Sequence, residues 1–297
     1  MPESNIEKFM SNDPREIVDF YNLFSCRRDL IKWIKGISKS SPLVNILGNQ
    51  ESEIAVVIPT PTADHPLAFN CLNETFRGLK IIFSVDKSIL FNLSRSYNIG
   101  ANSLSHDRNI KWVVFSNVDM MKIDFSAQLE KELGKLNDRV KFCYAKEGGS
   151  HSYRMRIGDY TYLRKITFSL SGGPRKIRSA LESKFSIHLN AEEDKHFLTK
   201  RLVHNHKSLI NFGDFFIFSI DLLKEYNFAP FDETYLNGME DIDLSFRLFQ
   251  DLDNDQLTEI DYRIGSMKSG VRGRGLNRVL RSIPSLAYFN EMMENYL

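Results

Sequence analysis

Two short clusters of oxygen-bearing side chains in this chain have types and spacings that could do chemistry. The first, Asn117-Val118-Asp119, directly follows the apolar run 112–115 and sets an amide and a carboxylate two residues apart. In an extended chain two such side chains point the same way, and their oxygens are hard ligands suited to Mg²⁺ or Mn²⁺. Asn and Asp are also common at ordinary strand-end turns. The triplet is therefore consistent with a metal site or with a simple turn.

The second cluster, Glu240-Asp241-Ile242-Asp243, places three carboxylates within four residues. Asn237 as N-cap, with Glu240 three residues later, predicts the start of a helix whose first turn is acidic, as the helix dipole favours. Three carboxylates are more than capping requires. A carboxylate held rigidly at a helix start, beside a bound substrate, is suited to act as a general base. Capping alone and general-base chemistry both stay open at this point.

A third feature is a basic run without acids between residues 263 and 281. Its glycines predict a flexible cationic loop, which suits a lid that neutralises a diphosphate leaving group. Contact with anionic lipid headgroups or RNA, or a simple solvated loop, are the alternatives. The run consists of Arg263, Lys268, Arg272, Arg274, Arg278 and Arg281.

Composition and missing motifs exclude several classes of protein. There is no phosphate-binding P-loop, no GxSxG nucleophile elbow, no HExxH and no GxGxxG between a strand and a helix. Cys26, Cys71 and Cys143 are too scattered for a disulfide framework or a zinc site. The 39 Lys and Arg residues balance 38 Asp and Glu residues, which argues against a nucleic-acid partner. The 42% hydrophobic content predicts a globular protein.

The elements that must position these residues alternate along the chain. Short apolar runs over 54–58, 79–85 and 112–115 are separated by helix-length segments over 66–76 and 91–105. This pattern predicts an α/β fold with a mostly parallel central sheet flanked by helices. Ligands of such sheets bind beyond the carboxyl ends of the strands. We therefore expect the polar groups at these strand ends to converge: Thr60, Thr62, Asp86, Asn117 and Asp119.

Both ends of the chain are predicted to be helical extensions. Asp13-Pro14 resembles a capped helix start, and apolar residues then recur at helical spacing from Ile17 to Ile34. We expect an N-terminal helical extension over 1–52, a main domain over 53–270, and a basic helical tail over 271–297 whose helix is interrupted at Pro284. Within the main domain we expect helices over 126–137 and 239–249 and a strand over 214–220.

The expected location is cytoplasmic. The N-terminus has no apolar signal-peptide core, and no apolar run approaches the ~20 residues of a membrane span. Membrane contact, if any, is expected to be peripheral, through residues 263–281. The helical extensions are expected to pack on the main domain or to self-associate into a homo-oligomer.

Four segments occur in a fixed order along the chain. They are the predicted strand and Pro-Thr turn over 54–60, the Phe-Asn-Leu-Ser … Asn-Ile-Gly helix over 91–100, the strand ending in Asn117-Val118-Asp119, and the Phe-Asp-Glu … Glu-Asp-Ile-Asp-Leu-Ser-Phe-Arg-Leu block over 231–248. Taken together, these segments resemble the GT-A glycosyltransferases, especially the inverting families 2 and 7. The resemblance spans roughly residues 54 to 270 and implies a GT-A fold for the main domain.

The resemblance implies an inverting transfer of sugar from a nucleotide-sugar, with a UDP-sugar expected, to a hydroxyl of a glycan or lipid-linked acceptor. Asp241 would be the general base, Glu240 would orient hydroxyl groups, and Asp119 would hold Mn²⁺ or Mg²⁺ on the diphosphate. The donor would be bound by Pro59, Thr60, Asp86, Arg95, Asn98, Asn117, Gly213 and Asp214.

Two departures from the family pattern leave other functions open. Asn117 stands for the first acid of the DxD motif, and Gly270 stands where family 7 has a metal-binding His. One alternative is a catalytically degenerate GT-A domain that binds glycans or partners. Another is a nucleotidyltransferase on a related sheet, although the Gly-rich basic loop expected after the first strand is missing.

Overall fold

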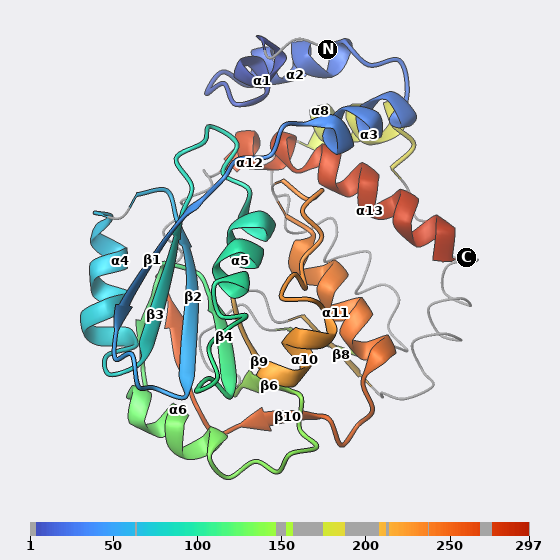
Figure 1. Cartoon of the computed structure of the whole chain (residues 1–297). Coiled ribbons are helices and arrows are strands. Elements are labelled where there is room, and N and C mark those ends of the chain that lie inside the picture. The colour runs from blue at the N-terminus through green and yellow to red at the C-terminus, as the bar shows by residue number, and fades with distance from the viewer. Residues whose placement is uncertain are drawn as a thin grey trace.

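The protein is built around a seven-stranded mixed sheet flanked by helices (Figure 1). The computed structural model describes residues 4–62, 64–146, 153–156, 175–187, 208–211, 214–236, 238–267 and 275–296. In order across the sheet the strands are β1 (Leu43–Gly48), β3 (Lys80–Val85), β2 (Ile54–Thr60), β4 (Trp112–Ser116), β9 (Phe215–Ser219), β6 (Phe142–Ala145) and β10 (Leu257–Ile260).

The strand directions confirm the α/β class and show where antiparallel strands enter. β2 pairs in parallel with both β3 and β4, and β10 pairs in parallel with β6. β9 is antiparallel to both of its neighbours, and β1 is antiparallel to β3. Strands β3, β2, β4, β6 and β10 therefore run one way, while β1 and β9 run the other.

β2 is buried along its whole length, as its unbroken apolar run predicts. Its pairing with β4 ends at Val57 opposite Phe115, whereas its pairing with β3 continues to Thr60. Pro59 has no N–H to donate, so the ladder toward β4 stops where the strand reaches this proline. The carboxyl end of β2 is therefore paired with β3 but not with β4.

Helix α5 (Leu93–Asn102) packs on β2 and β3 through a glycine. A Cβ atom at Gly100 would lie 2.4 Å from Cγ1 of Val57, and 3.6 Å from atoms of Ile82 and Ser84. Val57 is fully buried and β-branched, so its side chain has little room to move. The glycine therefore permits the close approach of helix and sheet.

Gly100→Ala is expected to destabilise the fold by about 1–3 kcal/mol, because the added methyl overpacks the core. Urea unfolding measures this change. Gly36→Ala is the matched control, since a Cβ atom there meets nothing within 4 Å. An unchanged midpoint for Gly100→Ala would show that α5 does not sit this close to β2.

The N-terminal extension contains three helices, α1 (Ser4–Phe9), α2 (Pro14–Asn22) and α3 (Arg27–Gly36). Asp13 caps α2 as predicted, accepting a hydrogen bond from the Arg15 N–H. The apolar face expected from Ile17 to Ile34 is buried, but it is carried by two helices with a break at residues 23–26. The same segment also contains β1, which extends the sheet to residues before 53.

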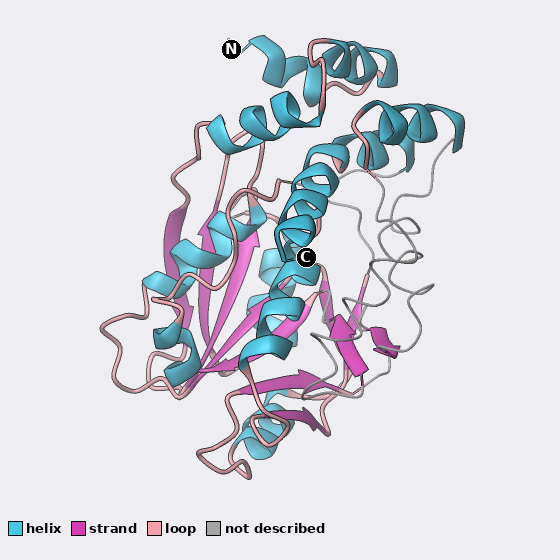
Figure 2. Cartoon of the chain, turned by 90° about the vertical axis from the view of Figure 1, so that its right-hand side faces the viewer, coloured by secondary structure: helices cyan, strands magenta, loops and turns pink. Residues whose placement is uncertain are grey.

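The C-terminal helices pack on this extension. They are α12 (Gly275–Arg281) and α13 (Ile283–Tyr296), which meet at Ser282, just before Pro284. The Tyr21 hydroxyl donates to the Leu280 carbonyl, and Lys35 forms an ion pair of 2.9 Å with Glu291. Figures 1 and 2 show the terminal helices as a layer beyond one end of the sheet.

The remaining elements surround the sheet. The predicted helix over 66–76 is divided into α4 (Pro66–Asn70) and a π-helical turn, η1 (Cys71–Thr75). Helix α6 (Ser126–Leu133) begins where predicted but ends four residues before the expected residue 137, and α11 (Glu240–Asp251) begins one residue later than expected and ends two residues later. Besides β1, β6 and β10, the elements that the sequence pattern did not reveal are α10 (Ile220–Glu225), α8 (Arg175–Lys184), and the two-stranded pairs β5 (Met120–Lys122) with β11 (Ile264–Ser266) and β7 (Tyr153–Arg156) with β8 (Ser208–Asn211).

Candidate functional site

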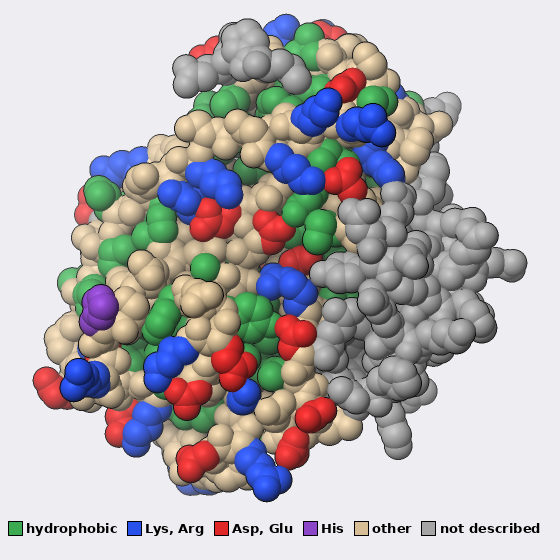
Figure 3. All heavy atoms as spheres, turned by 45° about the vertical axis from the view of Figure 1, so that its right-hand side comes forward, with side chains coloured by type: hydrophobic (Ala, Val, Ile, Leu, Met, Phe, Trp, Pro, Cys, Tyr) green, Lys and Arg blue, Asp and Glu red, His purple; other side chains and the backbone are tan. Residues whose placement is uncertain are grey.

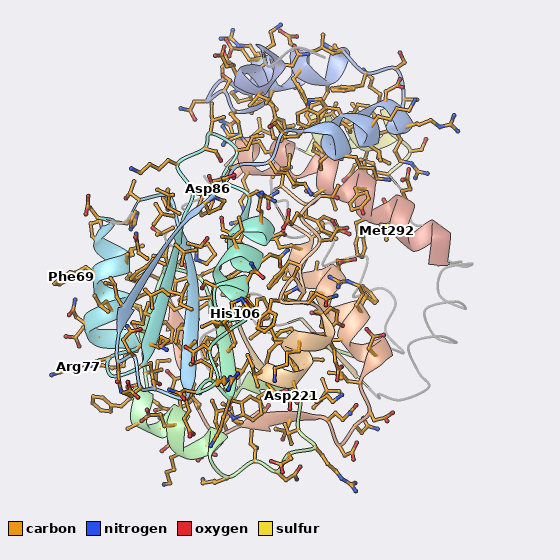
Figure 4. All side chains as sticks on the ribbon, in the orientation of Figure 1. Phe69, Arg77, Asp86, His106, Asp221 and Met292 are labelled. Atoms are coloured by element: carbon orange, nitrogen blue, oxygen red, sulfur yellow. The ribbon has the colours of Figure 1, made fainter. Side chains whose placement is uncertain are left out.

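Polar groups from four strands lie along the carboxyl edge of the central sheet. The Asp86 N–H, just after β3, donates to the Thr60 carbonyl at 3.0 Å. The Asn117 N–H, just after β4, donates to the Asp214 carbonyl at 3.1 Å, because the antiparallel strand β9 begins where β4 ends. The structure thus brings Thr60, Asp86, Asn117 and Asp214 to one edge, and Figure 4 shows Asp86 there, facing the terminal helices.

The Asn117 amide is held by two neighbours. Its Oδ1 accepts a hydrogen bond of 3.0 Å from the Tyr97 hydroxyl, and its Nδ2 donates to Asp214 Oδ1 at 2.7 Å. Val118 and Asp119 form a turn, so the extended arrangement predicted for residues 117 to 119 is wrong. The chain turns here because it passes directly into β5, which pairs with β11 instead of continuing the central sheet.

Asp119 lies half-buried in this turn. Its carbonyl accepts a hydrogen bond of 2.9 Å from the Met267 N–H, which ties the turn to the end of β11. Burial, followed by the nearby charge of Asp119, raises the pKa of the Cys71 thiol to about 12. Asp119 therefore lies on a constrained turn close to a thiol whose raised pKa keeps it protonated at neutral pH.

The donor set for a metal is small. Among the described residues, no group of three or more His, Cys, Asp and Glu side chains is placed to hold a metal ion. Gly270, which stands where the family has a His, lies outside the described residues. Mg²⁺ commonly binds one or two carboxylates together with substrate phosphates. Asp119 could supply one such carboxylate, and the other ligands would then have to come from a substrate or from water.

Asp86, which the resemblance assigns to donor binding at the position that usually contacts the base, is enclosed by other residues of the chain. It is 2% exposed. Its Oδ1 accepts from the Ser88 N–H at 2.9 Å, and its Oδ2 accepts from the Ser40 hydroxyl at 2.7 Å and from the Asn92 N–H at 3.2 Å. Ser40 comes from the linker between α3 and β1. A nucleotide base would have to displace this linker to reach the carboxylate.

Arg95 and Asn98 connect α5 to the segment before α11. Arg95 Nη1 contacts Glu233 Oε2 at 2.8 Å, and Arg95 Nε donates to the Ser40 carbonyl. Asn98 donates to the Phe231 carbonyl at 2.8 Å and accepts from the Phe231 N–H at 3.1 Å. The structure therefore places both residues, which the resemblance assigns to the donor, in contacts that fix the 231–233 segment.

Glu233 is the centre of this network. Burial raises its pKa, but hydrogen bonds from Asn98 and Arg95, with the charges of Arg95 and Lys39, outweigh burial and hold the pKa below its usual value of 4.5. A depressed carboxyl pKa stabilises the fold above the unfolded-state pKa, and this contribution is lost as pH falls through the folded-state value.

Glu233→Gln is expected to lower the free energy of unfolding by about 1 kcal/mol near neutral pH, because the hydrogen bonds at this position no longer involve a charged carboxylate. The difference from the parent protein should begin to shrink as pH falls below about 4.5 and should be lost as pH falls through the lower folded-state pKa, where the parent's Glu233 also becomes neutral. Urea unfolding across this pH range measures it, with the exposed Glu130→Gln as control. A difference that stays constant with pH would contradict the depressed pKa.

Helix α11 begins with an uncommon backbone conformation. Gly238 has φ 119° and Met239, the N-cap residue, has φ 76°, in the left-handed region. The prediction that Asn237 caps the helix is therefore wrong, because Met239 occupies that position; Asn237 itself lies outside the described residues. The helix starts directly at Glu240 after this backbone turn.

The first turn of α11 carries three carboxylates with different surroundings. Glu240 and Asp243 are buried, whereas Asp241 is half-buried and its Oδ1 accepts from the Ile242 N–H at 2.9 Å. Burial raises the pKa of Asp243, although Arg247 opposes this with an ion pair of 2.9 Å. In Figure 1, α11 runs from the side of the carboxyl edge down toward β10. Its acidic turn is therefore at the end of α11 that lies nearer the carboxyl edge of the sheet.

Two members of the basic run are structural. Arg263 binds Asp124 through its N–H and its guanidinium, at 2.8 and 2.9 Å. Arg281 is 9% exposed and donates to three carbonyls at the end of α1 and just beyond it. These two residues are therefore not part of a free lid. The predicted lid residues Lys268, Arg272 and Arg274, and the predicted donor residue Gly213, lie outside the described residues.

Neither a protein-family model nor a curated protein sequence matches this chain. Within the part of the chain that the structure describes, no helix combines the length and the apolar composition needed to cross a bilayer.

Proposed function

We propose that the chain is an inverting GT-A glycosyltransferase that transfers sugar from a nucleotide-sugar, with UDP as the expected nucleotide, to an acceptor hydroxyl. The observation that supports it most is the contact between two family-like segments far apart in sequence. Asn92, Arg95 and Asn98 of the first segment bind Phe231 and Glu233 of the second, across 133 to 141 residues. This contact ties the segment that precedes α11 to the helix that follows β3.

In this proposal three carboxylates of the chain have different roles in the reaction. Asp241 removes the proton from the acceptor hydroxyl as its oxygen forms a bond to C1 of the sugar. The bond from C1 to the diphosphate breaks in the same displacement, and the configuration at C1 inverts. Glu240, buried at the first position of α11, orients a sugar hydroxyl. A divalent cation held by Asp119 would neutralise charge on the departing diphosphate.

The proposal predicts that UDP with Mn²⁺ raises the melting temperature. A ligand that binds the folded state and not the unfolded state raises the free energy of unfolding by about 2.7 kcal/mol when the ligand concentration is 100 times Kd. Differential scanning fluorimetry measures this shift, with Asp119→Asn as the variant and exposed Asp255→Asn as the control. The shift should need Mn²⁺ or Mg²⁺ and should fall in the Asp119 variant only. If no nucleotide changed the melting temperature, that result would count strongly against a donor site.

A second candidate is a degenerate GT-A domain that binds glycans without transferring sugar. Two residues expected to bind the donor already form hydrogen bonds within the protein, which favours this candidate. Asn117 is hydrogen-bonded to Tyr97 and Asp214, and Asp86 is hydrogen-bonded to Ser40. Glycan-array binding without hydrolysis of any nucleotide-sugar would support this candidate. Release of pyrophosphate from a nucleoside triphosphate would instead indicate a nucleotidyltransferase.

A further inference from the structure

The charge of this nearly neutral chain is unevenly distributed over its helices. Residues 27–39, which contain α3, carry five basic residues and one acidic residue, and residues 175–187, which contain α8, carry four basic and one acidic. The whole chain has a net charge of only +1. The two segments are therefore strongly basic, and the rest of the molecule is acidic.

The two basic segments lie together in the terminal layer. Arg27 Nη1 donates to the Ser186 carbonyl at 3.3 Å, and Lys184 Nζ donates to the Tyr21 carbonyl at 2.9 Å. The rings of Tyr21 and Phe185 pack with their centroids 5.8 Å apart. Figure 1 shows α8 beside α3, and in Figure 3 several Lys and Arg side chains gather over the terminal layer, with some Asp and Glu side chains among them.

The basic residues of α3 share one exposed face. Arg28, Lys32 and Lys35 are exposed and recur at steps of four and three residues, which places them along one side of the helix, and the exposed Lys39 follows three residues after the helix ends at Gly36. Lys35 and Lys39 form ion pairs with Glu291 and Glu233. Within the described ranges, no carboxylate pairs with Arg28 or Lys32. These two cations are therefore available to an external anion.

The composition of this face favours a membrane over a single-stranded nucleic acid. Proteins that bind single-stranded nucleic acid offer exposed aromatic rings on which bases stack. Trp33 of α3 and Phe185 after α8 are both buried. The exposed apolar residue nearest in sequence to the face is Leu23, 47% exposed just before α3. An anionic bilayer needs only a surface of Lys and Arg, which it attracts within a Debye length.

We propose that the exposed face of α3 docks on anionic lipid headgroups at a membrane surface. This surface is distinct from residues 263–281, and the proposal does not depend on glycosyl transfer. The linker that follows α3 supplies Ser40 to Asp86. Docking through α3 would therefore bring the carboxyl edge of the sheet close to the bilayer.

Co-sedimentation of the full chain with vesicles tests the proposal. The vesicles contain phosphatidylcholine alone or a mixture with phosphatidylserine, at low and high salt. The variant is Arg28→Gln with Lys32→Gln, and the control is Arg108→Gln with Lys131→Gln, two exposed cations outside α3 and α8. All three proteins are checked by thermal unfolding, which exposed substitutions should leave unchanged.

The parent and control proteins should bind the phosphatidylserine vesicles and release them at high salt. The Arg28/Lys32 variant should bind about 30-fold more weakly. Equal binding to both kinds of vesicle, or equal loss in variant and control, would overturn the proposal. The proposal would also be overturned if the protein did not bind vesicles but bound an RNA oligonucleotide, and if that RNA binding were lost in the Arg28/Lys32 variant.

Discussion

Asp241→Asn is expected to lower the rate of sugar transfer by about 10²–10⁴-fold, because an amide cannot accept the proton of the acceptor hydroxyl. Affinity for the nucleotide should stay nearly unchanged, since the base acts on the acceptor. Transfer rates at saturating donor, together with the UDP-dependent melting shift, separate these two effects. The fold should be preserved, because Asp241 is only half-buried and an Asn oxygen can still accept from the Ile242 N–H.

The matched control for this variant is Asp251→Asn, at the other end of the same helix. Its carboxylate accepts from the Tyr226 hydroxyl, and an Asn oxygen can replace it. Asp251→Asn should retain full transfer. Normal turnover in Asp241→Asn would remove Asp241 from the role of base, while equal losses in both variants would point to damage to α11 rather than to chemistry.

Arg247→Met is expected to destabilise the protein by about 3–5 kcal/mol, because it leaves the buried carboxylate of Asp243 without its cation. Arg247 contacts Asp243 Oδ2 through Nε at 3.0 Å and donates through Nη2 to the Pro230 carbonyl at 2.8 Å. The Asp243 side chain is 6% exposed. Urea unfolding at neutral pH measures the loss of stability.

The double variant Arg247→Met with Asp243→Asn serves as control for this prediction. Removing both charges eliminates the uncompensated carboxylate, so the double variant should be more stable than Arg247→Met alone. The deficit of Arg247→Met should also shrink as pH falls, since a protonated Asp243 has no charge to compensate. If the double variant is the less stable of the two, the stability lost in Arg247→Met does not come from the unpaired charge of Asp243.

The parts of the fold that sequence predicted well are those with strong local signals. The apolar runs of β2, β3 and β4 and the Asp13 cap of α2 appear where their patterns place them. β6 and β10 were missed because four residues carry too little periodicity. β1 was missed because apolar residues lie exposed along it, with Leu43 67% and Ile46 44% exposed. Its strand conformation comes from pairing with β3, which no local pattern reveals.

The same distinction applies to the candidate site. The sequence predicted that strand ends would supply polar groups, and Thr60, Asp86 and Asn117 do share an edge. It did not predict what holds them, because the partners come from elsewhere: Ser40 lies 46 residues from Asp86, and Tyr97 lies 20 residues from Asn117. Ser40 sits in a polar linker with no motif. Tyr97 lies inside the family-like helix, although nothing in its sequence position assigns it a contact.

Turnover of a panel of nucleotide-sugars tests the central claim most directly. Released nucleoside diphosphate is measured with Mn²⁺ for the parent protein, Asp119→Asn and Asp241→Asn, with and without simple sugar acceptors. The account predicts hydrolysis or transfer of at least one donor, a UDP-sugar first, and loss of that activity in both variants. No turnover of any donor, or turnover untouched by both substitutions, would contradict it.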